Sequence, residues 1–278
     1  MAGFQLVGGG VGGGVQDGGG ERRTGAEGGW RGVTGGRGAM GGRGAMSGRG
    51  ARGGGRGVTG GRGVREPRRP QTRLPALEPY GGGELTPDGD YDGLDFRGTD
   101  LAGQDASGAR FLECALTGCA LDGTRLRRAR VLDSRLTGVR GVGTDLAEAG
   151  LRDTELLDAR LGGTQLHGAV LERVLVRGGK LDYVNLRSAR LTDVVFQDCV
   201  LIEPDFAGAR LNRVAFVGSR LTGADLTAAT LTDVDLRQAA ALDVARGLDR
   251  LAGAVIGTAQ LLDLAPVLAA RLGIRVED

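Results

Sequence analysis

The chain has 278 residues, of which 55 are glycine and only 4% are aromatic. So few aromatic residues argue against two ordinary globular cores, because aromatic side chains bury the largest areas. Three cysteines are too few for a disulfide framework, and a single histidine excludes metal sites built from several histidines. The sequence has no run of 18 apolar residues, and its first residues lack the basic and apolar regions of a secretory signal. We therefore expect a cytoplasmic protein without a membrane segment.

The formal net charge of +2 hides two oppositely charged parts. Residues 1–79 carry 13 arginines and 5 acidic residues, a net charge of +8, and residues 80–278 carry a net charge of −6. Residues 1–72 are rich in glycine and arginine, so little apolar area is available to offset the entropy of ordering them. We predict a disordered tail and linker over residues 1–72, in which the proline-rich residues 65–75 begin an extended connection to the body. Such a tail either binds nucleic acid through phosphates or is a flexible appendage.

From Tyr91 onward, every fifth residue is large and apolar. The pattern runs to Leu236 without a slip in phase, and 27 of its 30 positions are Leu, Phe or Val. The residue two places before each of them is mostly small, as at Ala109 and Thr124. A period of five fits neither an amphipathic helix nor a strand. It predicts a chain that turns a corner every five residues and sends one large and one small side chain into a stacked core, which is a solenoid.

The repeats are close to the pattern Ala-(Asp/Asn)-Leu-x-x at residues 99–101 (TDL), 224–226 (ADL) and 234–236 (VDL). On these residues the chain resembles the pentapeptide-repeat family over about residues 91–256. The resemblance implies an all-β solenoid, a right-handed quadrilateral β-helix with four pentapeptides in each coil. Thirty repeats would make about seven and a half coils and a rod about 36 Å long at the spacing of paired strands.

Both ends of such a rod need covering, because a bare sheet edge recruits other chains. We expect an N-terminal cap over residues 73–90, the β-helix over 91–240, and a last coil with a short helical cap over 241–278. Thr258 fits a helix N-cap, Gly273 fits the C-terminal stop, and Pro266 predicts a kink or two short helices. A leucine stripe follows helical spacing at Leu261, Leu264, Leu268 and Leu272.

The stripe has two interpretations, which can both hold. It packs on the last coil as a cap, or it forms the surface of a homodimer. The second interpretation follows from the resemblance, because a C-terminal helix pairs two rods end to end in the family members that confer fluoroquinolone resistance.

The sequence contains no catalytic set. The acidic residues fall at outward positions of a convex rod, whereas acid–base chemistry needs a concave and partly desolvated site. His167 is also at an outward position, and the three cysteines occupy small inward positions as core residues. The glycine runs lack the context of a phosphate-binding loop. We predict that the protein is not an enzyme and that it uses no cofactor and no metal.

With 20 residues in a coil, residues i and i+20 stack, so the sequence predicts four surface columns. They are a basic column of Arg140, Arg160, Lys180 and Arg220; a second basic column of Arg110, Arg130, Arg190 and Arg210; an acidic column of Asp105, Asp145, Asp205 and Asp225, broken by Arg125; and a small exposed apolar strip of Leu175, Val195 and Ala215. The first of these is the candidate interaction column.

These columns favour a protein-interaction or scaffold rod without catalysis, whose protein partner the sequence does not identify. One alternative follows from the resemblance, in which an acidic rod mimics DNA and binds a type II topoisomerase, gyrase. Residues 91–238 carry 21 acidic and 19 basic residues, which is nearly neutral and disfavours mimicry. The other alternative is weak nucleic-acid binding through the arginine columns and the Arg-Gly tail.

Overall fold

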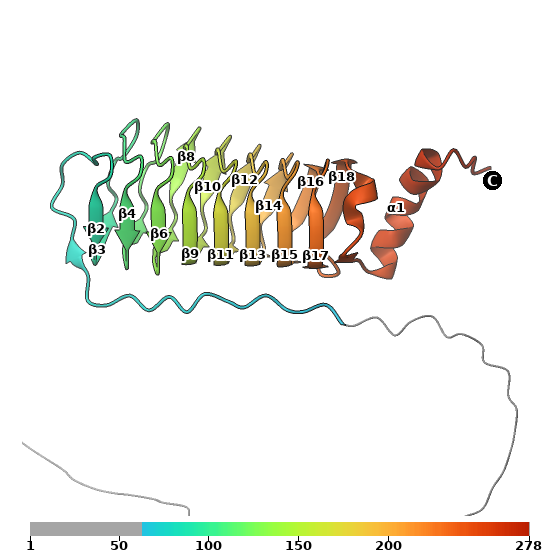
Figure 1. The fold of residues 1–278 in the computed structure, drawn as a ribbon, viewed down its shortest axis with the longest axis horizontal. Helices are drawn as coiled ribbons and strands as arrows, with labels where there is room; N and C mark the ends of the chain where they lie inside the picture. The colour runs from blue at the N-terminus through green and yellow to red at the C-terminus, as the bar shows by residue number, and fades with distance from the viewer. Residues whose placement is uncertain (1–62, 278) are drawn as a thin grey trace, which may run out of the picture. The chain divides into compact units, whose positions relative to one another are not determined.

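The computed structural model describes residues 63–277, which form a parallel β-solenoid followed by one C-terminal helix (Figure 1). The solenoid expected from the five-residue period is confirmed. Ten strands from β1 to β19 follow one another in a single sheet path, so the chain completes about nine turns. This exceeds the seven and a half coils expected from the repeats, because the segments before Tyr91 and after Leu236 add strands to the stack.

The larger sheet has 13 strands and the smaller has six, and every pairing is parallel. The larger sheet consists of β1 (Glu78–Pro79), β2 (Asp90–Asp92), β3 (Leu94–Arg97), β4 (Arg110–Leu112), β5 (Ala115–Thr117), β6 (Arg130–Leu132), β7 (Arg135–Thr137), β9 (Gly150–Leu157), β11 (Val170–Arg177), β13 (Arg190–Gln197), β15 (Arg210–Val217), β17 (Thr230–Asp235) and β19 (Ala254–Val255). The smaller sheet consists of β8 (Arg140–Val142), β10 (Arg160–Gly162), β12 (Lys180–Asp182), β14 (Val200–Ile202), β16 (Arg220–Asp225) and β18 (Ala241–Arg246).

Each coil has four sides, which we number in chain order. Face 1 holds β2, β4, β6 and the first halves of β9 to β15, and face 2 holds β3, β5, β7 and the second halves. Face 3 is the smaller sheet. Face 4 is a ladder of single bridges from Asp105 to Asp225. Faces 1 and 3 are ten residues, half a coil, apart, so they lie on opposite sides of the rod.

The core follows the two inward positions of each repeat. Large side chains such as Phe96, Phe206 and Leu201 are fully buried. The small inward residues are buried too, and several donate a hydrogen bond to the carbonyl 23 residues earlier. Thr124 Oγ1 lies 2.8 Å from the carbonyl oxygen of Leu101, and Cys119 Sγ lies 3.1 Å from that of Phe96. These bonds satisfy polar groups that would otherwise be buried without partners.

The first coil is covered by residues that precede the repeats. The ring of Tyr80 stacks on Phe96 with centroids 4.2 Å apart, and Leu85 is buried in the core. The backbone N–H of Leu85 donates to Gln104 Oε1 at 2.8 Å. These contacts close the N-terminal end of the core.

The last coil ends in β18, the 3-10 helix η1 (Leu248–Leu251) and β19, and α1 (Thr258–Arg271) follows. The helix N-cap is Gly257, not the expected Thr258, and its N–H donates to Gln260 Oε1 at 2.8 Å. Pro266 lies inside a single helix rather than between two short ones, and Gly273 follows the helix with φ 71°.

Residues 63–77, which we call the arm, run along the solenoid from its C-terminal toward its N-terminal end (Figure 1). Arg65 bonds to Asp233 on β17, Arg68 to Asp193 on β13, and Thr72 to Asp153 on β9. The extended linker expected over residues 65–75 is therefore seen in contact with the rod, a contact that the composition of the segment does not predict. The rest of the tail, residues 1–62, lies outside the described residues.

Candidate interaction surfaces

The basic column lies on face 3 in the register expected from the 20-residue coil. Arg140 pairs with Arg160 and Arg160 with Lys180 across β8, β10 and β12. Val200 separates Lys180 from Arg220 on β14 and β16. The three adjacent basic residues are therefore stacked about 4.8 Å apart, the spacing of paired strands.

Most of the column makes no ion pair within residues 63–277. Lys180 Nζ lies 2.8 Å from Asp182 Oδ2, whereas Arg140, Arg160 and Arg220 make no ion pair within the described part of the chain. Asp122 lies beside them, but it accepts the N–H of Val142 at 2.9 Å. Like charges directly opposite one another on adjacent strands repel. Within the described chain, an ion pair offsets the positive charge of this column only at Lys180.

The column borders a shallow depression in face 3. Arg140, Gly141, Arg160, Gly162 and Lys180 contribute to its lining. Val142 stands at its side with 69% of its surface exposed. A guanidinium-rich hollow with an exposed apolar side chain has the mixed composition of a protein interface, in which arginine and apolar residues are enriched.

The second basic column lies on face 1, and it is broken. Gly150 and Val170 fall between Arg130 and Arg190, so only Arg190 and Arg210 are direct neighbours in its second half. Arg110 is paired with Asp90 at 3.0 Å. The two basic columns face opposite directions, so a single flat partner cannot contact both.

The acidic column on face 4 is largely neutralised. Its four aspartates accept backbone N–H groups two residues ahead, from Ser107, Ala147, Ala207 and Thr227. Each is also ion-paired, with Arg125, Arg127, Arg187 or Arg246 respectively. The carboxylates therefore close the turns of the coil, which is the usual role of aspartate at such positions.

The pKa of Asp105 shows the same engagement. It is lowered from its ordinary value, first by the hydroxyl hydrogen bond from Ser107, and then by the Ser107 N–H and by Arg125. A carboxylate held this way has little capacity left for a partner.

The apolar strip on face 2 is not exposed, contrary to the expectation from the sequence. Leu175, Val195 and Ala215 stack in register and point outward, yet they are only 7%, 3% and 8% exposed. Arg68 bonds to Asp193 and Arg69 to Gln197, two residues to either side of Val195. The arm therefore runs along the strip and covers it.

Family models match the part of the sequence that has the five-residue repeat. A model described as "Pentapeptide repeat region" matches residues 109–186, and one described as "Pentapeptide repeats (8 copies)" matches residues 180–216 and 205–239. The chain is a pentapeptide-repeat protein. No curated protein matches the sequence.

Solved structures of other pentapeptide-repeat proteins are similar in fold. HetL, from the cyanobacterium Nostoc sp. strain PCC 7120 and involved in heterocyst differentiation regulation, is 25% identical with a TM-score of 0.42, over 63% of this chain and 92% of HetL. Full-length QnrB1, a plasmid-mediated fluoroquinolone resistance protein, is 21% identical with a TM-score of 0.36, over 69% of this chain and 95% of QnrB1. Rfr23 from the cyanobacterium Cyanothece 51142 is 18% identical with a TM-score of 0.27, over 48% of this chain and 89% of Rfr23.

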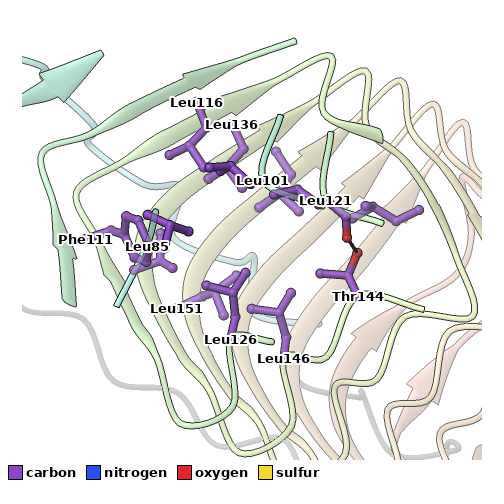
Figure 2. A pocket seen from close by; sticks show the side chains of 13 residues that line it. Leu85, Leu101, Phe111, Leu116, Leu121, Leu126, Leu136, Thr144, Leu146 and Leu151 are labelled. Carbon is purple, nitrogen blue, oxygen red and sulfur yellow. Dashed lines mark hydrogen bonds between the residues drawn. The ribbon is translucent and has the colours of Figure 1, made fainter. Parts of the chain in front are cut away.

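The interior of this pentapeptide-repeat protein has no built ligand site among the described residues. A cavity of about 30 Å³ lies in the N-terminal half of the solenoid, and Figure 2 shows leucines on all of its sides. Its one polar group, Thr144 Oγ1, already donates to the carbonyl of Leu121 at 2.7 Å. A buried water needs two to four polar partners, so this cavity is a dry packing defect.

Groups that could perform chemistry are scattered. Residues 63–277 contain no cluster of three or more His, Cys, Asp or Glu side chains that could hold a metal ion. Burial raises the pKa of the thiols of Cys114, Cys119 and Cys199, which are fully packed in the core. None of the helices in this part of the chain is long and apolar enough to cross a membrane.

The leucine stripe of α1 divides between two environments. Leu264 is buried and Leu268 packs against the core, so this side of the helix covers the last coil. Leu261 and Leu272 are exposed, together with Leu262. The cap contact thus uses the middle of the stripe, and a homodimer surface that includes Leu261 and Leu272 stays a prediction.

Proposed function

We propose that this pentapeptide-repeat protein is a non-catalytic interaction rod whose face 3 binds an acidic surface of a protein partner. The observation that carries the proposal is the in-register stack of Arg140, Arg160 and Lys180, in which only Lys180 makes an ion pair within the described chain. Stacked like charges weaken the isolated rod slightly, and an acidic partner removes that repulsion on binding.

The composition of the face favours protein over nucleic acid. The continuous basic stack spans two strand spacings, roughly 10 Å, before Val200 interrupts it. A nucleic-acid duplex carries a charge about every 1.7 Å, and affinity for it grows with the number of phosphates contacted. A short basic stack beside the exposed Val142 suits a compact acidic protein surface better.

Mimicry of DNA, as in a gyrase-binding rod, has less support. A mimic needs free carboxylates along one face, whereas those of Asp105, Asp145, Asp205 and Asp225 are held by turn amides and arginines. The likeness to QnrB1 concerns the fold alone.

The only lysine of the sequence provides the test, because it lies in the column. Acylation of Lys180 by an amine-directed reagent, followed by peptide mass spectrometry, reports occupancy of face 3 whatever else the chain binds. Poly-glutamate of about 20 residues is the acidic probe, and a 20-base-pair DNA duplex is the competitor. We expect poly-glutamate to slow the acylation of Lys180 at least fivefold, and to slow it more than the duplex does at equal charge concentration.

Two charge-matched variants provide the control. Arg140→Glu with Arg160→Glu reverses face 3, and Arg190→Glu with Arg210→Glu makes the same change in net charge on face 1. Protection of Lys180 should disappear in the first variant and persist in the second. Equal loss in both would mean that only net charge matters, and stronger protection by the duplex would replace the proposal with nucleic-acid binding.

A further inference from the structure

The arm lies along the corner between faces 1 and 2, where each of six successive coils contributes one charged residue. The corner column, in stacking order, is Asp133, Asp153, Arg173, Asp193, Arg213 and Asp233. Arg173 donates to both carboxylate oxygens of Asp153, which lies one coil before it. Arg213 donates in the same way to both oxygens of Asp193. From Asp153 onward, carboxylates therefore recur every second coil.

Two arginines of the arm bind this column in the same way. The backbone N–H of Arg68 lies 3.2 Å from Asp193 Oδ1, and its Nε and Nη2 lie 2.9 and 2.7 Å from Oδ2. The backbone N–H of Arg65 lies 3.4 Å from Asp233 Oδ1, and its Nε lies 2.6 Å from Oδ2. Three residues of the arm thus correspond to two coils of the solenoid.

This correspondence is the one that a polyproline II conformation of the arm would produce. A polyproline II helix advances about 3.1 Å per residue and repeats every three residues, so one turn is about 9.3 Å long. Two coils of the solenoid advance about 9.6 Å. An arginine at every third residue of such a helix therefore meets a carboxylate at every second coil, without accumulating mismatch over a few turns.

The arm also has the apolar periodicity of a docked polyproline II segment. Val64, Pro67 and Pro70 are partly buried, whereas Arg65 and Arg68 are exposed overall. Beneath them, Leu175, Val195 and Ala215 point outward from face 2 and are nonetheless buried. Pro67 and Pro70 frame the two arginines Arg68 and Arg69, which bond to either side of Val195. The partly buried residues of the arm therefore match the apolar strip, and its arginines match the carboxylates of the corner column.

We propose that the strip Leu175, Val195 and Ala215, together with the carboxylates of Asp153, Asp193 and Asp233, is a binding groove for a proline-rich segment of another protein in polyproline II conformation with arginines three residues apart. The arm occupies this groove as a resident ligand of the same chemistry. The groove lies on face 2 and its corner, so it is separate from the basic column of face 3.

The arm fills only part of the groove. Three residues after Arg68 the chain has Gln71 rather than a third arginine, and the contact near Asp153 is a bond from the Thr72 hydroxyl to the backbone carbonyl. An open hollow remains there, lined by Gln71, Asp133, Asp153 and Arg173 among others. A partner segment with arginines at three consecutive register positions fills this hollow, which gives it an advantage over the arm.

A resident ligand attached to the same chain competes at high effective concentration, so the test releases the arm first. In the full chain with Arg65→Glu and Arg68→Glu, the two arm residues that bind Asp233 and Asp193 become negatively charged, so these carboxylates repel them. Its matched control is Arg73→Glu with Arg275→Glu, the same charge change at two exposed residues that make no ion pair and no side-chain hydrogen bond in the described chain. The probes are fluorescent peptides with the sequence of residues 63–74 and with its Gln71→Arg form, and binding is followed by anisotropy.

We expect the released chain to bind the residue 63–74 peptide at least tenfold more tightly than the control chain does, and to bind the Gln71→Arg peptide more tightly still. A peptide with glycine in place of both prolines should bind at least tenfold more weakly. Adding Asp193→Asn or Asp233→Asn to the released chain should lower the affinity; Asp233→Asn leaves the Arg213–Asp193 pair intact and thus serves if Asp193→Asn impairs folding.

Three outcomes would overturn the proposal. The first is absence of binding to the released chain, and the second is binding that neither aspartate variant weakens. The third is a concentration-dependent dimer of the unmodified chain, seen by sedimentation velocity, that Arg65→Glu with Arg68→Glu abolishes. That result would make the groove a site for the arm of a second copy rather than for a different protein.

Discussion

Asp193 is fully buried between two arginines, Arg213 from the next coil and Arg68 from the arm. Arg213 donates to both of its carboxylate oxygens, at 2.6 and 2.8 Å. Burial alone would raise the pKa of Asp193, but the hydrogen bonds from Arg213 and Arg68 outweigh burial and hold the pKa well below its usual range. The Asp193 carboxylate therefore binds both the next coil of the solenoid and the arm, which covers the apolar strip of face 2.

Replacing Asp193 tests how much its two ion pairs contribute to the free energy of unfolding. Asp193→Asn keeps the shape but leaves two guanidinium groups without their counter-charge. Because hydrogen bonds to charged groups contribute about 1.5–3 kcal/mol each, we expect the free energy of unfolding to fall by about 2 kcal/mol in urea titrations. Asp133→Asn is the control, since Asp133 occupies the same corner without an ion pair to any described residue, and the change should alter the free energy by less than about 0.5 kcal/mol. Equal effects would contradict the role of the pair.

Docking of the arm should depend on pH only in acid. The pKa of Asp193 is lowered as described, and the pKa of Asp233 is lowered first by the side-chain hydrogen bond from Arg65. A carboxylate whose folded pKa is depressed contributes stability above its unfolded pKa, about 3.9, and loses it as the pH falls through the folded value. We expect the amide NMR signals of Arg65 and Arg68 to stay in place from pH 7 to 4 and to shift toward unstructured positions below that.

A transition of these signals between pH 5 and 7 would contradict the prediction, because carboxylates whose pKa values are lowered stay ionised over that range. The same titration of the Arg65→Glu, Arg68→Glu chain serves as the control, because its arm signals should already have unstructured positions at pH 7.

The sequence alone predicts the solenoid because its large inward residues repeat at five without a slip, so each coil adds the same layer. The surface columns follow from that register, and Arg140, Arg160 and Lys180 are neighbours as expected. The exposed strip at Leu175 and Val195 is wrong, because its cover comes from a segment more than 100 residues away that carries no repeat.

A signal for the arm is nevertheless present in the sequence. Arg65 and Arg68 are three residues apart, and Asp193 and Asp233 are two coils apart at one corner. Only the lengths of a polyproline II turn and of two coils connect these facts. The sequence contains no reason to place the linker on the rod, so the match between arginine and aspartate spacing cannot be recognised from it. Residues 65–75 are therefore predicted only as a connection.

Gly141 shows that a departure from the repeat can be built into the structure. It stands where the repeat has a large residue, yet a Cβ at this position would lie 2.7 Å from Thr144 Oγ1 and 2.9 Å from the backbone of Leu121. We expect Gly141→Ala to lower the free energy of unfolding by about 1–3 kcal/mol through overpacking. Gly150→Ala is the control: a Cβ there meets nothing within 4 Å, and its φ is not positive.

Thermal unfolding of the two alanine variants checks this. Gly150→Ala should be neutral or raise the melting temperature slightly, because alanine restricts the unfolded chain. If Gly141→Ala were also stabilising, the inward space at this coil would be underfilled, as the repeat pattern suggests at first sight.

The buried threonines offer a last comparison within one type of position. Thr124 Oγ1 donates to the carbonyl of Leu101 at 2.8 Å, whereas Thr164 Oγ1 is buried without a hydrogen-bond partner among the residues that the structure describes. The carbonyl 23 residues before Thr164 is that of Gly141, which lacks the side chain found at this position in other coils. Thr124→Val should lower the free energy of unfolding by about 0.5–1.5 kcal/mol, because the carbonyl of Leu101 loses one of its two donors and keeps only the N–H of Gln104, at 3.2 Å. Thr164→Val should instead leave the free energy unchanged or raise it, because it removes a hydroxyl that is already desolvated without compensation. Urea titrations of the two valine variants decide the matter, and equal losses would mean that the Thr164 hydroxyl has a partner in solution.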